Sequence, residues 1–229
     1  MRLLRKQDTN AEHCFSSYLQ KYLYPKLELD SFCRTDFYKD QIGGVDVWLE
    51  KHGHCLAVDE KLAAHYLNTK KDNFVLELVT PKGNPGWFLN DDLKTDVYAF
   101  IWGRLDEKKF PFQQNERRND YFKTMKETDI TGALVMFIRK SALRNWFAQK
   151  GFTSDFLYKS AVSMRRMPTK KKIRWKTMKD RNGKELYGVK GMALSLYLDR
   201  SSQSSRLALL LSVCSVWVLS PSLWTATVL

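Results

Sequence analysis

Two aspartates and one lysine are the residues whose type and spacing best suit chemistry. Asp46 lies in the segment Gly-Val-Asp, and Asp59 and Lys61 lie in Val-Asp-Glu-Lys, thirteen residues further along the chain. Hard divalent cations prefer oxygen ligands, and Mg²⁺ is usually held by one or two carboxylates together with water and substrate phosphate. Asp46 and Asp59 could therefore hold Mg²⁺, or Mn²⁺ in its place.

A predicted β-hairpin brings the two aspartates together. Residues 41–49 are expected to form a strand entered through two glycines, residues 51–54 a turn, and residues 55–61 the returning strand. Asp46 and Asp59 then fall on neighbouring strands. His52 and His54 in the turn could also be metal ligands, but no further ligands follow at a recognisable spacing, which favours a plain turn.

The alternation of side chains along a strand assigns a role to the lysine. Positions 59 and 61 share one face of the strand, and Glu60 faces the other side. The Lys61 ammonium would lie beside the cation, where it could orient the attacking water. It could equally stabilise the negative charge of a phosphorane-like transition state.

The remaining segments predict an α/β fold. A helix is expected from Thr9, which has the capping-box spacing with Glu12, to near Pro25. Residues 93–102 fit a strand or a helix equally well. Two more strands and two more helices are predicted over residues 74–80, 132–138, 141–151 (with Ser141 as the cap) and 154–164.

Length and composition favour one domain of a cytoplasmic protein. The 229 residues suit a single core, and we expect it to occupy residues 1–200. Hydrophobic residues at 44% argue against disorder, and charged residues at 28% argue against a polytopic membrane protein. Four cysteines without regular spacing indicate reduced thiols rather than a disulfide framework.

The positive charge is concentrated in the second half of the chain. Residues 121–200 hold 19 Lys and Arg against 6 Asp and Glu, whereas residues 1–120 hold 18 against 19. The basic part, about residues 160–200, could neutralise backbone phosphates, or its lysines could protect an edge strand. The predicted nucleic-acid-binding residues are Arg165, Arg166, Lys170, Lys171, Lys172, Arg174 and Lys176.

The last segment, residues 201–229, differs from the rest. The 23 residues after Arg206 carry no charge, so by length and hydropathy they could anchor the chain in a membrane. Four serines and Pro221 argue against an anchor, and a shifted reading frame would give the same contrast.

The order of these features resembles the PD-(D/E)XK superfamily of restriction-endonuclease-like nucleases. The helix bearing Glu12, then Gly-Val-Asp46, then Val-Asp59-Glu-Lys61 is similar to the α-β-β-β-α-β core of that superfamily, although no proline precedes Asp46. Residues 86–102 also resemble a bacterial family of unknown role within it. The resemblance covers roughly residues 9–150 and implies a central mixed sheet flanked by helices. It also implies Glu12 as a further metal ligand, although the capping box explains Glu12 equally well.

The resulting expectation is a Mg²⁺-dependent nuclease that hydrolyses DNA and uses Asp46, Asp59 and Lys61. A homodimer stays open, because cutting both strands often needs two sites. The alternatives are a non-catalytic nucleic-acid-binding module on the same fold and a membrane-tethered interaction protein. The aromatic residues Trp87, Phe88 and Tyr98 could stack on a base or, more simply, belong to the core.

Overall fold

The protein is described by a computed structural model, in which the chain divides into two compact units. The first unit comprises Met1–Lys71, Lys94–Ile138 and Trp224–Leu229, and the second comprises Asp72–Leu93 and Arg139–Leu223. The prediction of a single domain over residues 1–200 stays a prediction. The structure describes residues 2–35, 38–64, 67–68, 73–110, 118–165, 172–175, 178–179, 185–186, 194–199, 206–212 and 224–228.

A mixed six-stranded sheet forms the first unit, with the strand order β1-β2-β3-β5-β6-β12. Strands β1, β2 and β3 form an antiparallel meander, β3 pairs with β5 in parallel, and β6 pairs with β12 antiparallel. The predicted mixed α/β class is therefore confirmed. The strands are β1 (Ser31–Arg34), β2 (Val47–Lys51), β3 (His54–Leu62), β5 (Val97–Leu105), β6 (Ile130–Arg139) and β12 (Trp224–Val228).

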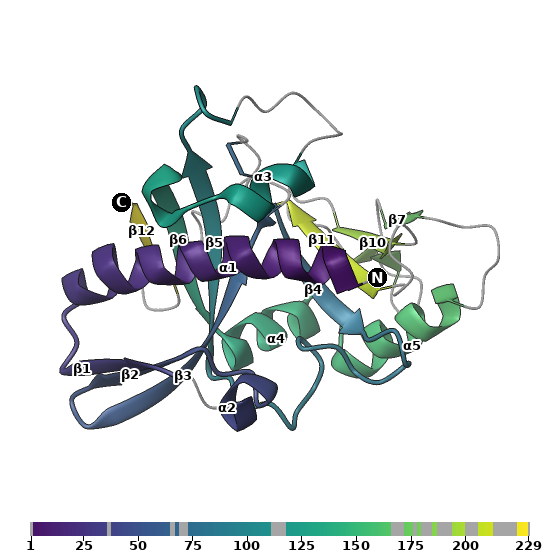
Figure 1. The fold of residues 1–229 in the computed structure, drawn as a ribbon. Helices are drawn as coiled ribbons and strands as arrows, with labels where there is room; N and C mark the ends of the chain where they lie inside the picture. The colour runs from purple at the N-terminus through teal and green to yellow at the C-terminus, as the bar shows by residue number, and fades with distance from the viewer. Residues whose placement is uncertain are drawn as a thin grey trace. The chain divides into compact units, whose positions relative to one another are not determined.

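Helix α1 (Arg2–Tyr22) lies across this sheet, as Figure 1 shows. Its buried residues recur every four positions, and they share a hydrophobic core with alternate residues of β2, β3 and β5. The helix packs closely on Gly103 of β5, where an added Cβ atom would lie 1.9 Å from the ring of Phe15. The buried stripe of the helix consists of Ala11, Phe15 and Leu19, and it continues to Leu23.

Shorter helical elements complete the first unit. Helix α3 (Arg118–Thr124) lies beside α1, and Asn10 of α1 donates hydrogen bonds to the carbonyls of Phe122 and Met125 at 2.6 and 3.0 Å. The remaining elements are η1 (Tyr24–Lys26), α2 (Tyr38–Ile42) and η3 (Glu127–Asp129).

The predicted start of the first helix is wrong. Helix α1 begins at Arg2, so Thr9 and Glu12 lie inside it and do not form a capping box. Leu, Arg, Lys and Gln before Thr9 are strong helix formers, and a threonine does not stop a helix that is already under way.

The predicted hairpin is confirmed, although its first strand is shorter than expected. His52 and Gly53 both have positive φ angles, 51° and 72°, which is typical of the type I′ turn that joins two antiparallel strands. Gln41 and Ile42 belong to α2 rather than to the strand, and Gly44, with a φ angle of 73°, turns the chain out of that helix. Position 46 therefore stands directly before β2.

Elsewhere the predicted helices and strands are largely confirmed, with errors at their ends. Residues 93–102 fitted a strand or a helix equally well, and residues 97–102 of this segment belong to strand β5. Helix α4 (Lys140–Gln149) has Arg139 at its N-cap without a side-chain bond, so the predicted cap at Ser141 is wrong and that serine lies inside the helix. Helix α5 (Ser154–Arg165) begins as expected.

The second unit contains a four-stranded sheet of order β4-β11-β10-β7. Helix α4 holds the segment that follows β4: Arg144 donates to the carbonyl of Phe88 through Nε (2.9 Å) and Nη2 (2.7 Å), and Lys140 donates to that of Asn90 at 2.8 Å. The strands are β4 (Asn73–Val79), β7 (Lys172–Trp175), β10 (Leu194–Asp199) and β11 (Arg206–Ser212), with a separate pair β8 (Met178–Lys179) and β9 (Glu185–Leu186).

Parts of the uncharged C-terminal segment are strands. β11 lies between β4 and β10 in the second unit, and β12 pairs with β6 in the first. Among the residues that the structure describes, no helix is both long enough and apolar enough to cross a membrane.

Candidate active site

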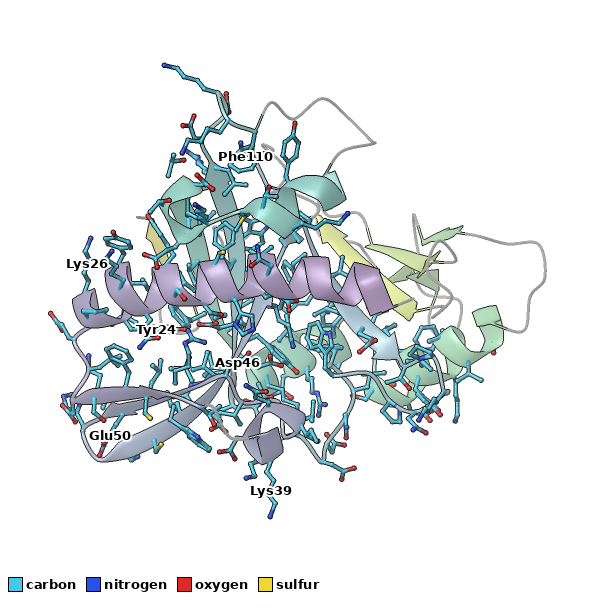
Figure 2. The ribbon with its side chains drawn as sticks, viewed as in Figure 1. Tyr24, Lys26, Lys39, Asp46, Glu50 and Phe110 are labelled. Carbon is cyan, nitrogen blue, oxygen red and sulfur yellow. The ribbon has the colours of Figure 1, made fainter. Side chains whose placement is uncertain are left out.

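Asp46 and Asp59 come together because β2 and β3 pair in the register that the hairpin sets. Val47 pairs with Val58, and the backbone N–H of Asp46 continues the ladder by donating to the Val58 carbonyl at 2.8 Å. The Asp46 carboxylate accepts a hydrogen bond of 2.7 Å from the N–H of Glu60. Figure 2 shows Asp46 and Glu50 toward opposite ends of β2, with Glu50 nearer the hairpin turn.

Asp59 and Lys61 form an ion pair on one face of β3. The Lys61 Nζ atom lies 2.6 Å from Oδ1 of Asp59, and the two side chains are 26% and 4% exposed. Oδ2 of Asp59 is buried and accepts no hydrogen bond from the described part of the chain. A buried carboxylate oxygen without a partner costs free energy, which points to a ligand at this position.

Burial favours the protonated form of the Asp46 carboxyl. The loss of solvent around its carboxyl, and next the negative charge of Asp59, raise its pKa to about 7. Lys61 and the N–H of Glu60 act in the opposite direction but do not cancel these effects. Two ionised carboxylates at this depth repel one another, and a divalent cation between them would relieve that repulsion.

The pKa values of the neighbouring pair are raised as well. For Asp59 burial outweighs the charge and hydrogen bond of Lys61 and a hydrogen bond with the Asp46 carboxyl, so the pKa of Asp59 lies above its ordinary value. For Lys61 burial acts to lower the pKa, but the negative charges of Asp59, Asp46 and Glu12 outweigh it. The lysine therefore stays protonated at neutral pH and can serve as a donor and a positive charge.

Glu12 lies near this pair on an exposed position of α1, and its charge contributes to the raised pKa of Lys61. Its predicted role as a ligand stays a prediction. In the described residues no group of three or more His, Cys, Asp and Glu side chains is arranged to hold a metal ion. The chain thus offers two carboxylates, and water and phosphate would have to supply the other ligands.

Glu60 faces the opposite side of β3, as the alternation predicts. It accepts hydrogen bonds from Ser16, Tyr24 and Arg34, which lie 26 to 44 residues away in sequence. No local pattern indicates these three residues, because their significance arises only from contacts between α1, η1, β1 and β3.

The predicted nucleic-acid-binding residues fall mostly outside the described residues. Arg165 is the last residue of α5, and Lys172 and Arg174 belong to β7, which is an edge strand of the four-stranded sheet. An edge position agrees with the alternative that lysines protect this strand, and phosphate binding stays a prediction. Those outside the described residues are Arg166, Lys170, Lys171 and Lys176.

Two of the three aromatic candidates for base stacking are core residues. Phe88 is 1% exposed and Tyr98 is not exposed, so the core alternative is correct for both. Trp48 is the aromatic residue that the sequence reasoning missed. It is partly exposed on β2, two positions after Asp46, and pairs with the small residues Cys33 and Ala57 on the flanking strands.

Comparisons with known proteins identify no family for this chain. No protein-family model matches the chain, and neither does any curated protein or solved structure. The function is therefore inferred from the geometry of the site.

Proposed function

We propose that this protein is a metal-dependent nuclease that hydrolyses phosphodiester bonds in DNA, with Asp46, Asp59 and Lys61 as its catalytic set. The observation that carries the proposal is the state of two carboxyls, one buried (Asp59) and one partly buried (Asp46). Asp59 keeps one buried oxygen without a hydrogen-bond partner in the described part of the chain, and the pKa of Asp46 rises to about 7.

A divalent cation fits these residues better than a purely structural role does. Lys61 pairs with Oδ1 of Asp59 and its charge also acts on Asp46, but burial and the charge of Asp59 still raise the pKa of Asp46 to about 7. Asp46 and Oδ2 of Asp59 are the oxygens that would hold Mg²⁺ or Mn²⁺, with water and substrate phosphate as the other ligands. When bound, the cation would supply positive charge at the phosphate and activate water as a nucleophile.

We propose that Lys61 acts on the substrate. Its side chain is 26% exposed, whereas that of Asp59, which it contacts, is 4% exposed. From there it can hold the attacking water or stabilise the charge that develops on the phosphate oxygens. Its raised pKa keeps it charged and makes it a poor general base.

The fold also supports the proposal. Helix α1, the meander β1-β2-β3 and the parallel neighbour β5 occur in the order that the PD-(D/E)XK resemblance implies. One difference is that the described residues between β3 and β5 form strand β4, where the resemblance implies a helix. The basic second half of the chain suits a polyanionic substrate.

Cleavage of labelled DNA by the full chain tests the proposal. We expect plasmid or single-stranded DNA to be cut in Mg²⁺ or Mn²⁺ and to remain intact in EDTA. Salt-dependent DNA binding without cutting in either metal would contradict the proposal and favour the non-catalytic binding module.

Trp48 is expected to contact the substrate beside the scissile phosphate. Two residues along a strand span about 6.5 Å, so an indole at position 48 would be within reach of a nucleotide whose phosphate is held at Asp46. Because a stacked base contributes about 1–3 kcal/mol, Trp48→Ala should raise KM for single-stranded DNA about tenfold and leave kcat nearly unchanged. Steady-state kinetics on a short oligonucleotide measure both constants. Tyr22→Ala, at another exposed aromatic of the first unit, is the control, and an unchanged KM for Trp48→Ala would rule out the contact.

A further inference from the structure

The carboxylate of Glu60 lies at the centre of a buried hydrogen-bond cluster. Its oxygens accept bonds from Ser16 Oγ (2.7 Å), Tyr24 Oη (2.6 Å), Arg34 Nη1 (3.0 Å) and Arg34 Nη2 (2.8 Å). The side chain of Glu60 is 5% exposed and that of Arg34 is 20% exposed. We call Ser16, Tyr24, Arg34 and Glu60 the Glu60 cluster.

Stability alone is a weak explanation for such a cluster. Removing two charges from water costs several kcal/mol per ion, and apolar residues of similar size often replace a buried ion pair without loss of stability. Four hydrogen bonds to one carboxylate do fix its geometry, because each donor restricts where the carboxylate can lie, although Arg34 Nε has no partner in the described part of the chain. The position that is fixed here is residue 60, between Asp59 and Lys61.

The backbone of the cluster contacts the second aspartate directly. The N–H of Glu60 donates to the Asp46 carboxylate at 2.7 Å. On the other side, Thr35 follows Arg34 in the chain, and its N–H donates to the Asp46 carbonyl at 3.0 Å. The Arg34–Glu60 pair therefore ties together the segments on both sides of Asp46.

We propose that the Glu60 cluster positions Asp46 and Asp59 for a divalent cation by holding β1 and β3 at a fixed spacing around the start of β2. The inference rests on the proposed nuclease function. Two ionised carboxylates repel one another, so without this restraint the strands would relax and the cation would find its ligands too far apart. The members of the cluster are positioning residues, because they contact neither the cation nor the substrate.

Tyr24→Phe tests the inference, because it deletes one hydrogen bond to Glu60 and keeps the buried ring. Residues that orient metal ligands typically change metal affinity by 10- to 100-fold, so we expect Tyr24→Phe to weaken Mn²⁺ binding about tenfold. Isothermal titration of the full chain with MnCl₂ measures the dissociation constant without any substrate. In cleavage assays the same variant should lower kcat at subsaturating Mn²⁺ and leave KM for DNA unchanged.

Ser31→Ala is the matched control, because it removes an exposed hydrogen bond of 2.8 Å between Ser31 of β1 and Glu50 of β2 in the same meander, outside the Glu60 cluster. It should bind Mn²⁺ like the parent. Ser16→Ala deletes a different bond of the Glu60 cluster and replaces Tyr24→Phe if that variant does not fold.

The two proposals fail in different ways. If the parent chain binds Mn²⁺ and cuts DNA, and the cluster variants bind Mn²⁺ equally well, the positioning role is wrong and the nuclease remains. If the parent chain itself binds no Mn²⁺ and cuts no DNA, the nuclease proposal is wrong and the positioning role is wrong with it.

Discussion

Asp59→Asn is expected to lower metal-dependent DNA cleavage by about 10³-fold. The substitution keeps the size of a side chain that is 4% exposed, but it removes the charge that would hold the cation and that pairs with Lys61. Losing a single preorganised electrostatic group costs about 10²–10³ in kcat, and losing a metal ligand should cost at least as much. Single-turnover cleavage of labelled DNA at saturating protein measures this loss.

The same experiment includes a second catalytic variant, Lys61→Met, and a control variant, Glu50→Gln. Lys61→Met should lower the single-turnover rate and leave Mn²⁺ affinity less affected, because the lysine acts on substrate rather than on the cation. Glu50→Gln changes a carboxylate at an exposed position of β2, four residues after Asp46, and it should cleave like the parent. If Asp59→Asn cleaves at the rate of Glu50→Gln, the catalytic assignment is wrong.

In the absence of metal the protein is expected to lose stability as the pH rises from about 4 to about 7. Burial, and next the charge of Asp59, raise the pKa of Asp46 from 3.8 to about 7 in the folded state. Between these values the unfolded chain has released the proton and the folded chain retains it, so the free energy of unfolding falls with rising pH. At about 1.4 kcal/mol per pKa unit, the loss should be of the order of 2–4 kcal/mol.

Urea unfolding at pH 5, 6, 7 and 8 in EDTA checks this pH dependence. Asp46→Asn cannot ionise, so its free energy of unfolding should change less over the same range. Mg²⁺ should restore stability to the parent at pH 8, because it binds the ionised carboxylates of the folded state. Parallel pH profiles for the parent and Asp46→Asn would contradict the buried, proton-retaining state of Asp46.

The sequence by itself determined the local geometry of the candidate site. A turn at His52 and Gly53 between two apolar runs fixes an antiparallel hairpin, and the register of a hairpin places Asp46 beside Asp59. The period of two along a strand separates Glu60 from Asp59 and Lys61. These features depend on residues within about twenty positions of one another, which is the range over which periodicity and turn chemistry act.

Only the tertiary structure decided how those residues are surrounded. The donors to Glu60 come from α1, η1 and β1, and the charges that set the pKa of Lys61 include Glu12 on α1. Helix α1 also begins earlier than periodicity indicated. Periodicity did not decide between a strand and a helix for the segment that contributes to β5, residues 97–105. The physical reason is that burial, desolvation and long-range hydrogen bonds depend on which elements pack together, and local sequence patterns do not encode that choice.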